Sequence, residues 1–411
     1  MLSLNNSLAL NSLALAHVPA VQYSYFIYGD RVHPSLTATN TGGTYIDANG
    51  ARQDAPTDQV RVTHTSQGAL LGVVGESQSP NSLHDSYDCR QWNAIGGAVK
   101  TDLGNYSDVF RRVSVASNGG SWHRIRDQQD FTLALNEQVA ITVFYEAGTS
   151  NQAFIELRST GGTYATVFVT DIAGGVFSSY SDNGSTFHNI QQKLEKDGRY
   201  KLTFGVTCGE AGTYALGVGP NTTVVGETII ALGGMIEKGT LVPSSFVKTS
   251  GGSAVRTADV ITAPWPFKEC VIIARFRARD IGVAGSKALT IFDKNGPNWW
   301  YNFATIIYDS IAQQVKCEIG FNGAVTSNTH DIVHAPDTSI QVALALSDAA
   351  IKFSVDGAAP KTIIGNVPPL NQLQVMCNGD GGEQLNGTMD LLMPYPQGNV
   401  TDAKLQELAT Q

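Results

Sequence analysis

RYKLTFGVT, residues 199–207, shows the residue pattern that decides the fold. Apolar side chains occupy every second position, and polar or small residues lie between them; the apolar positions are Tyr200, Leu202, Phe204 and Val206. Successive side chains of a β-strand point to opposite faces, so this alternation predicts a strand with one buried face and one face in water.

The same period of two recurs elsewhere in the chain. It appears in TYALGVG (213–219) and QVALALSD (341–348). Two further alternating runs end in Asn322-Gly323 and Asp356-Gly357, dipeptides that supply the positive φ angles of tight hairpin turns. Many short strands joined by such turns predict antiparallel sheets.

Helical periodicity is convincing only at the C-terminus, in NVTDAKLQELATQ (399–411). Thr401 is suited to cap this helix, and Leu405 and Leu408 fall on one of its faces. The predicted fold class is therefore all-β, with antiparallel sandwiches and one short C-terminal helix.

Composition narrows the class of protein and its partners. The chain has 411 residues, of which 42% are hydrophobic, enough for two or three domains with ordinary cores. The formal net charge is -9 and no basic cluster is present. Nucleic acid is therefore not an expected partner, because phosphate binding needs concentrated Lys and Arg.

Cysteines and apolar runs bear on localisation. Five cysteines are scattered singly without a CxxC pair, as in proteins folded in reducing cytoplasm. No apolar run approaches the ~20 residues that span a bilayer, so no membrane insertion is predicted. The N-terminus lacks the positive segment of a signal peptide, and none is predicted. Its NSLAL repeat, at 6–10 and 11–15, fits either an anchor that docks into an assembly or an element packed on its own domain.

No catalytic constellation is evident in the sequence. Glycan-cleaving enzymes on such sandwiches usually need two carboxylates across the scissile bond. The Glu195-Lys196-Asp197 run is followed by Gly198 and is predicted to be a turn. His330 and His334 lack a third metal ligand of clear identity nearby. We therefore predict no catalytic residues, no metal ligands, no cofactor and no enzymatic activity.

Aromatic residues are the candidates for ligand contacts. NWWYNF (298–303) places Trp299, Trp300 and Tyr301 side by side, so in a strand at least one ring faces away from the core. Exposed rings stack on the apolar faces of sugars, and they also serve protein interfaces. Trp122 and Tyr180 are isolated candidates of the same kind. The alternative is that two of the adjacent rings are core residues and the third packs at a subunit boundary.

A Ser-, Thr- and Gly-rich stretch, EKGTLVPSSFVKTSGGSAVRTADVIT (237–262), interrupts the strand-like runs. It has no partner residues for catalysis, so it is predicted to join two domains. Pro243 marks the end of a strand, and the run 250–253 supplies a short hinge. Arg256 and Asp259 are expected to tie this linker to a sandwich surface.

Several stretches, taken in order, resemble virion proteins of bacteriophage fibres and tails. GTYIDANGARQDAPTDQVRVTH (43–64) resembles a turn-and-strand block of that family, and GALLGVVGESQSPNSLHDSYDCRQWN (68–93) resembles a degenerate form of its next block. DGRYKLTFGVT (197–207) is similar to the family's Gly-Trp-Tyr-Arg strand, with Arg199 in place of the tryptophan. ALGGMIEKGTLVPSSFVKTSGGSAVRTADV (231–260) resembles the end of the family's jelly roll. LNGTMDLLMPYPQGNVTDAKLQELAT (385–410) resembles the last strand and helix of a concanavalin A-like, laminin-G-like domain.

The resemblance implies a structural protein of a phage tail, baseplate or head fibre that displays two tandem jelly rolls. Such proteins are commonly homotrimers and often engage host-surface glycans. The implied organisation is an N-terminal anchoring segment (1–35), a β-rich connecting region (36–84), a first jelly-roll sandwich (85–248), a linker (249–262) and a second concanavalin A-like sandwich (263–411). The N-terminal segment would contact other virion proteins, and the protein, made in the host cytoplasm, would reside in the virion.

Two other functions stay open from the sequence. One is a decoration or assembly protein whose sandwiches contact only neighbouring subunits. The other is a carbohydrate-binding module of a glycan-degrading enzyme. Sandwiches of this kind serve lectins, enzymes and structural parts alike, so the fold does not decide among these functions.

Overall fold

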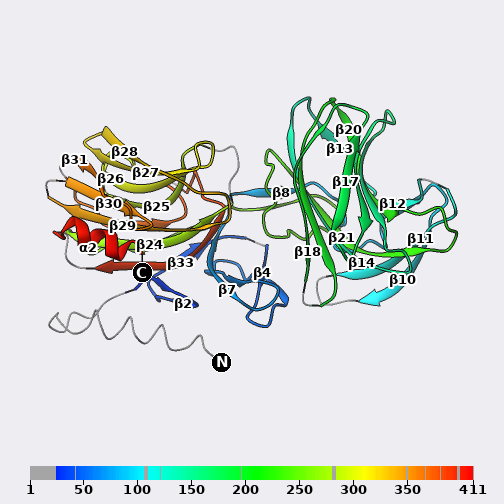
Figure 1. The fold of residues 1–411 in the computed structure, drawn as a ribbon, viewed down its shortest axis with the longest axis horizontal. Coiled ribbons are helices and arrows are strands. Elements are labelled where there is room, and N and C mark those ends of the chain that lie inside the picture. Colours follow the sequence, from blue (N-terminus) through cyan, green and yellow to red (C-terminus); the bar gives the residue numbers. More distant parts are fainter. Residues whose placement is uncertain are drawn as a thin grey trace.

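The computed structural model is almost entirely β, as the alternating runs predict. It describes residues 25–410 apart from 42, 106–109, 121, 196, 280–283, 349, 366, 380 and 396–398. Two β-sandwiches lie side by side along the long axis of the molecule (Figure 1). Most of the predicted N-terminal anchoring segment, residues 1–24, lies outside the described residues.

The first sandwich packs two antiparallel sheets face to face. Within the described residues, its six-stranded sheet has the order β10 (Val99–Asn105), β11 (Arg111–Ala116), β21 (Thr228–Lys238), β14 (Gln138–Ala147), β19 (Tyr200–Thr207) and β18 (Thr186–Leu194). Its seven-stranded sheet has the order β17 (Val176–Ser181), β16 (Tyr164–Asp171), β15 (Ala153–Ser159), β20 (Gly212–Pro220), β12 (Arg124–Arg126) and β9 (Asn93–Ile95), and β13 (Phe131–Leu133) also pairs with β20.

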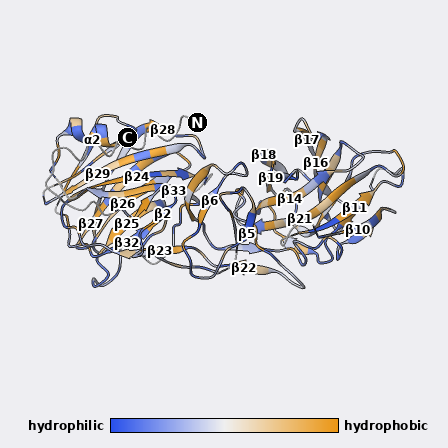
Figure 2. Ribbon diagram, turned by 90° about the horizontal axis from the view of Figure 1, so that it is seen from below, coloured by the Kyte–Doolittle hydropathy of each residue, from blue (hydrophilic) through white to orange (hydrophobic). Residues whose placement is uncertain are grey.

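The core of the first sandwich lies between these two sheets. Leu202, Phe204 and Val206 of β19 point into it, which confirms the buried face predicted for residues 199–207. Orange, hydrophobic residues run along the strands of both sandwiches in Figure 2. Burial of apolar surface contributes about 25 cal/mol for each Å², so such an interior is the main stabilising contribution to each sandwich.

The second sandwich also has two antiparallel sheets. Within the described residues, one has nine strands: β2 (Arg31–Val32), β1 (Ile27–Tyr28), β33 (Gly387–Tyr395), β24 (Cys270–Ala278), β29 (Ser339–Ser347), β30 (Ala350–Val355) and β31 (Lys361–Ile364) in order, with β7 (Leu70–Gly75) paired to β33 and β6 (Val62–His64) paired to β7. The other has the order β28 (Ala324–Val333), β27 (Gln314–Phe321), β26 (Phe303–Asp309), β25 (Ser286–Phe292), β32 (Gln372–Val375), β23 (Val260–Pro264) and β3 (Thr37–Thr39).

The hairpin turns and the terminal helix match their predicted local chemistry. Asn322 and Gly323 have φ of 52° and 79°, and Asp356 and Gly357 have φ of 45° and 74°, all in the left-handed region. Helix α2 (Asp402–Leu408) is capped by the Thr401 side chain, which accepts a hydrogen bond from the Lys404 backbone N–H at 3.2 Å. Its two leucines pack on the outer surface of the nine-stranded sheet.

The strands of the second sandwich extend beyond its predicted boundaries. Part of the predicted connecting region 36–84 belongs to the second sandwich, because β3, β6 and β7 are strands of its sheets. β1 and β2, which fall within the predicted segment 1–35, belong there too, and so does β23, which begins inside the predicted linker. β1, β2, β3 and β6 have only two or three residues each, too few to show a period, so their sheet partners depend on distant parts of the chain.

The remaining strands join the sandwiches. β8 (Ser79–Asn81) pairs with β22 (Ala254–Arg256), so the predicted linker is partly a two-stranded sheet. β4 (Thr44–Ile46) pairs with β5 (Arg52–Asp54) as a separate hairpin that lies between the sandwiches in Figure 1. The hairpin reaches the first sandwich through Arg52, whose Nη2 lies 2.8 Å from Glu195 Oε1.

Candidate functional site

The two outward faces of the first sandwich differ in what covers them. On the six-stranded sheet, Phe110 and Phe144 pack against Phe246 from the segment that leaves the sandwich, with ring centroids 5.0 and 5.4 Å from that of Phe246. These rings are buried, so this part of the face is closed to ligands. The outward face of the seven-stranded sheet instead carries large aromatic side chains in contact with solvent: Trp122 is 38% exposed and Tyr180 is 52% exposed.

Three aromatic rings lie side by side on the seven-stranded sheet, and we call Trp122, Tyr164 and Tyr180 the aromatic row. The ring centroids of Trp122 and Tyr164 are 5.1 Å apart, and those of Tyr164 and Tyr180 are 5.8 Å apart. Ala165 and Val167 of β16 face the core. Tyr164 therefore points outward, because side chains alternate between the two faces of a strand.

Arg158 connects the row to the sheet beneath it. Its guanidinium carbon lies 5.7 Å from the centroid of the Trp122 ring and 5.5 Å from that of Tyr164, within the range of cation–π attraction. Its Nη1 donates a 3.0 Å hydrogen bond to Glu156 Oε1. The Glu156 carboxylate is fully buried and also pairs with Arg124 Nε at 2.9 Å. The carboxylate thus holds both guanidinium groups in place beneath the rings.

A glycine makes room for this arrangement. Gly217 of β20 lies directly opposite Glu156 of β15 in the sheet. A Cβ atom on Gly217 would come within 2.7 Å of Arg124 Cδ. A larger residue would therefore displace Arg124 from the buried carboxylate and loosen the support of the row.

The chemistry of this surface suits a sugar. Ring faces bury the C–H faces of a pyranose, while a guanidinium and a phenol donate hydrogen bonds to its hydroxyl or carboxyl oxygens. Burial raises the pKa of the Tyr164 phenol, and the neighbouring Tyr180 and Asp182 raise it further. The phenol thus stays protonated and can donate a hydrogen bond at neutral pH.

The sequence named two of the three rings in the row but not their association. Trp122 and Tyr180 were isolated candidates, and the structure links them through Tyr164. The sequence did contain a feature that could have identified Tyr164. The TGGT turn at 160–163 closes a hairpin in which Arg158 pairs with Tyr164, so the guanidinium lies beside the Tyr164 ring.

Trp299, Trp300 and Tyr301 lie in the second sandwich and are not part of the row. They were predicted on a strand, but they occupy a turn that ends before β26. The Asn295-Gly296-Pro297 run before them is turn-forming, which explains the difference. Trp299 is only partly exposed, and its ring centroid lies 5.5 Å from that of Phe303. Its side chain lies so close to Gly379 that a Cβ atom at position 379 would clash with it. Trp300 is 48% exposed.

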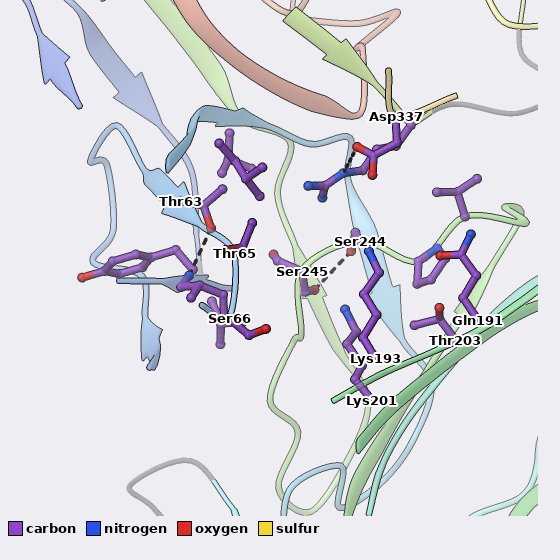
Figure 3. Close-up of a pocket in the computed structure, with 18 of the residues that line it drawn as sticks. Thr63, Thr65, Ser66, Gln191, Lys193, Lys201, Thr203, Ser244, Ser245 and Asp337 are labelled. Atoms are coloured by element: carbon purple, nitrogen blue, oxygen red, sulfur yellow. Dashed lines mark hydrogen bonds and ion pairs between the residues drawn. The ribbon is translucent and has the colours of Figure 1, made fainter. Parts of the chain in front are cut away.

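A hollow lies between the sandwiches, and we call it the cleft (Figure 3). Its volume is about 660 Å³. The walls come from β18 and β19 of the first sandwich, from the segments 44–46 and 63–67, and from residues 241–245. Arg279, Pro336 and Asp337 of the second sandwich also line it, together with Arg52, Leu71, Val74 and Glu76. In Figure 3 the Lys193 and Lys201 side chains lie side by side and face this space.

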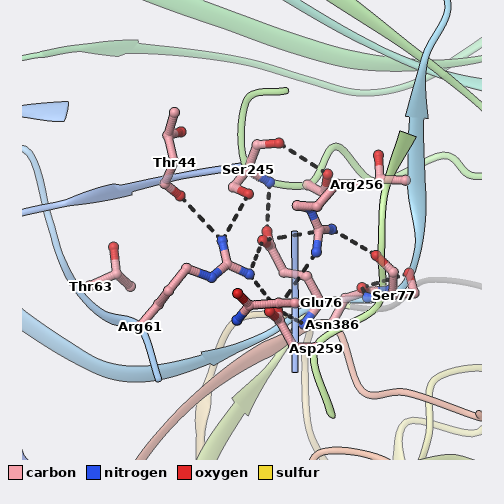
Figure 4. A network of polar contacts seen from close by, with 12 residues as sticks. Thr44, Arg61, Thr63, Glu76, Ser77, Ser245, Arg256, Asp259 and Asn386 are labelled. Atoms are coloured by element: carbon pink, nitrogen blue, oxygen red, sulfur yellow. Dashed lines mark hydrogen bonds and ion pairs between the residues drawn. The ribbon is translucent and has the colours of Figure 1, made fainter. Parts of the chain in front are cut away.

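Beneath the cleft, four charged side chains form a buried joint network: Arg61, Glu76, Arg256 and Asp259 (Figure 4). Arg61 Nη2 lies 3.1 Å from Glu76 Oε2 and also donates to Asp259 Oδ2. Arg256 Nη1 lies 3.6 Å from Asp259 Oδ2, which places the predicted Arg256–Asp259 pair in the joint between the sandwiches. The two arginines hold the pKa of Glu76 down at about 2, against the opposing effect of burial.

Within the described part of the chain, neither a metal-ligand cluster nor an unpaired Glu195 carboxylate is present. No group of three or more His, Cys, Asp or Glu side chains there is placed to hold a metal ion. Glu195, the first carboxylate of the Glu-x-Asp run, pairs with Arg52 and with Arg199 Nε at 2.5 Å, which lowers its pKa to about 2.

Of the helices in the described residues, none is both long and apolar enough to cross a membrane.

The class of protein follows from these sheets: it is an all-β protein of two antiparallel β-sandwiches in tandem. No protein-family model matches the sequence. No curated protein matches it either.

Solved structures with some similarity include sugar-binding and laminin modules. The sialidase module CBM40 of Ruminococcus gnavus, solved with α2,6-sialyllactose, is 12% identical and aligns over 35% of this chain and 84% of its own, with a TM-score of 0.29. The LG4-5 domains of the mouse laminin α1 chain are 14% identical over 77% of this chain and 94% of theirs, with a TM-score of 0.26. The tandem CBM22 domains of Paenibacillus barcinonensis Xyn10C are 11% identical over 79% and 98%, with a TM-score of 0.25.

Proposed function

We propose that the first sandwich binds a glycan on the aromatic row. The observation that carries this proposal is the set of solvent-facing rings held around Arg158, with the buried Glu156 carboxylate fixing the guanidinium from below. Fixed rings and donors lose little conformational freedom when a ligand binds, so such a surface is prepared for a rigid, hydroxyl-rich partner.

Replacing Trp122 with alanine tests the proposal. Trp122 is 38% exposed and packs against Tyr164, so its loss should lower the free energy of unfolding without preventing folding. It should also lower glycan affinity about tenfold, the value of burying part of an aromatic side chain against a sugar. Binding to isolated bacterial envelope polysaccharide and to an oligosaccharide array would be measured for both proteins. Trp300→Ala is the matched control, because Trp300 is similarly exposed but lies in the other sandwich.

The same pair of variants separates the two sets of predicted contacts. Loss of binding in Trp122→Ala with normal binding in Trp300→Ala supports the row. The reverse result would transfer the site to the turn that holds Trp299, Trp300 and Tyr301. Unchanged binding in both variants, or no glycan bound by the unmodified protein, would overturn the proposal and favour a decoration or assembly role.

We further propose that the protein displays this site on a bacteriophage particle as a non-enzymatic, homotrimeric adhesion component. The sequence resemblance to virion proteins supports this proposal, as does the position of the NSLAL repeat ahead of the sandwiches. A variant lacking residues 1–24 tests the anchor without removing β1, which the longer segment 1–35 includes. The variant should fold and bind glycan but fail to join particles; normal incorporation would contradict the anchoring role.

A further inference from the structure

Two lysines face each other across the wall of the cleft. Lys193 of β18 and Lys201 of β19 are direct cross-strand partners. Leu202 and Phe204 point to the core, so Lys201 and Thr203 point outward, and Gln191 lies opposite Thr203 on the same face. Like charges directly opposite in a sheet repel each other, so this pair destabilises the free protein unless a counter-charge is present.

Within the described residues, neither ammonium group has a salt-bridge or hydrogen-bond partner. The carboxylates that line the cleft are already engaged. Glu76 belongs to the joint network, and Glu195 is shared by Arg52 and Arg199. Asp337 Oδ1 lies 3.6 Å from Arg279 Nε. The cleft is therefore locally cationic, although the whole chain carries a net charge of -9.

The direction of the pKa shift of Lys201 agrees with this imbalance. Burial and the positive charge of Arg52 lower the pKa of Lys201 to about 8, despite the opposing effect of Glu195. An anion placed between the two ammonium groups would supply the missing charge and raise that pKa again.

Besides the charged side chains, the groups around the lysines include neutral hydrogen-bonding groups. The Gln191 amide and the Thr203 hydroxyl lie beside the lysines, and Ser244 and Ser245 lie on the facing segment (Figure 3). Amides and hydroxyls of this kind both donate to and accept from sugar hydroxyls. The volume of about 660 Å³ is that of an ordinary small-ligand site.

We propose that the cleft binds a carboxylate- or sulfate-bearing saccharide, with its acidic group between Lys193 and Lys201 and its hydroxyls on the neighbouring amide and hydroxyl side chains. This site does not rest on glycan binding at the aromatic row. The lysines lie on the outward face of the six-stranded sheet, and the row lies on the outward face of the seven-stranded sheet, so the two sites can fail separately.

Calorimetric titration of the full chain tests the proposal with a carboxylated probe, tetragalacturonate, a sulfated chondroitin tetrasaccharide, the neutral maltotetraose and inorganic sulfate. At least one acidic tetrasaccharide should bind, more tightly than sulfate, while maltotetraose should not. The Lys193→Gln/Lys201→Gln variant should lose about tenfold or more in affinity, since each ammonium supplies a charge-assisted hydrogen bond. Raising the salt concentration should also weaken the binding of the acidic saccharide to the unmodified protein.

Matched variants keep the result interpretable. Lys268→Gln removes an ammonium that is 80% exposed and outside the cleft, and it should bind like the unmodified protein. The double variant should melt at the same or a higher temperature, because it removes a repulsive pair, so a loss of binding is not a loss of folding. Trp122→Ala should keep acidic-saccharide binding at the cleft. Absence of binding for both acidic probes, equal affinity in the double variant, or binding of sulfate that exceeds both saccharides would overturn the proposal.

Discussion

Replacing Glu76 with glutamine should weaken the joint between the sandwiches more than any surface charge change would. Glu76 is 2% exposed and lies between two buried arginines, Arg61 and Arg256. Its Oε1 also accepts a 2.5 Å hydrogen bond from the Ser245 backbone N–H, which ties the segment leaving the first sandwich to the second. A glutamine keeps the shape of the side chain but leaves two positive groups facing one remaining carboxylate.

The size of the effect follows from the lowered pKa of Glu76. Its pKa falls from 4.5 to about 2 in the folded protein, and a tenfold change in proton affinity corresponds to about 1.36 kcal/mol. The ionised carboxylate therefore contributes about 3 kcal/mol to the free energy of unfolding, in line with the cost of breaking a buried ion pair. The variant should be less stable by about that amount at pH 7.

The pH dependence has a definite sign. The folded pKa lies below the unfolded one, so the stabilisation is present above pH 4.5 and is lost as pH falls through about 2. The gap between Glu76→Gln and the unmodified protein should therefore be widest near neutrality and narrow toward pH 2. Glu195, whose pKa is also about 2, keeps part of the acid sensitivity in both proteins.

Urea denaturation at pH 7 and at pH 3 would measure the difference, followed by tryptophan fluorescence and by circular dichroism. Two probes are needed because a chain of two sandwiches need not unfold in one step. Asp348→Asn is the control: its pair with Lys268 is mostly exposed and should change stability by less than about 0.5 kcal/mol. A loss in Glu76→Gln below about 1 kcal/mol at pH 7, or a gap that does not narrow in acid, would refute the reasoning.

Two further predictions concern the same region. Burial and the nearby charge of Glu76 raise the pKa of Glu237 from 4.5 to about 7, so its stabilisation is complete below pH 4.5 and is lost as pH rises through about 7. Glu237→Gln should remove this decline, and at pH 8 its free energy of unfolding should exceed that of the unmodified protein by up to about 3 kcal/mol. Urea denaturation measures this difference. The same change in the free energy of unfolding between pH 5 and 8 in both proteins would contradict the prediction. Phe246→Ala should lower the free energy of unfolding by about 3–5 kcal/mol, because the ring is buried against Phe110 and Phe144. Val225→Ala is the control: this position is 74% exposed, so the free energy of unfolding should change little. Comparable melting temperatures for the two variants would contradict the packing argument.

The strands that the sequence predicted are those whose pattern is local. In β19 the alternation extends over eight residues, so which side is buried can be read without knowing the neighbours. β3 is different: its three residues pair with β23, more than 200 positions further along the chain. Nothing within Thr37–Thr39 encodes that partner, which explains why residues 36–84 were assigned to a connecting region.

The ligand contacts show the same division. Tryptophan and tyrosine are conspicuous residue types in a sequence, so Trp122 and Tyr180 were candidates. Their supporting residues are ordinary by type: Glu156 matters because it is buried between two arginines, and burial is a property of the folded sheet. The rings can be predicted from composition, but the support that makes them one surface depends on strand register.

The lysine pair of the cleft shows how a distant contact can set such a register. A two-residue turn at Asp197-Gly198 would pair Lys201 with Leu194. Instead the loop is longer, with the Glu195 N–H bonded to the Arg199 carbonyl at 2.8 Å, and Lys201 faces Lys193. The Glu195 side chain that begins this loop is bound by Arg52, 143 positions earlier in the chain. We infer that docking of the β4–β5 hairpin favours the register that brings the two ammonium groups together. Arg52→Ala should weaken acidic-saccharide binding, both because it releases Glu195 and because it removes a positive charge from the cleft wall.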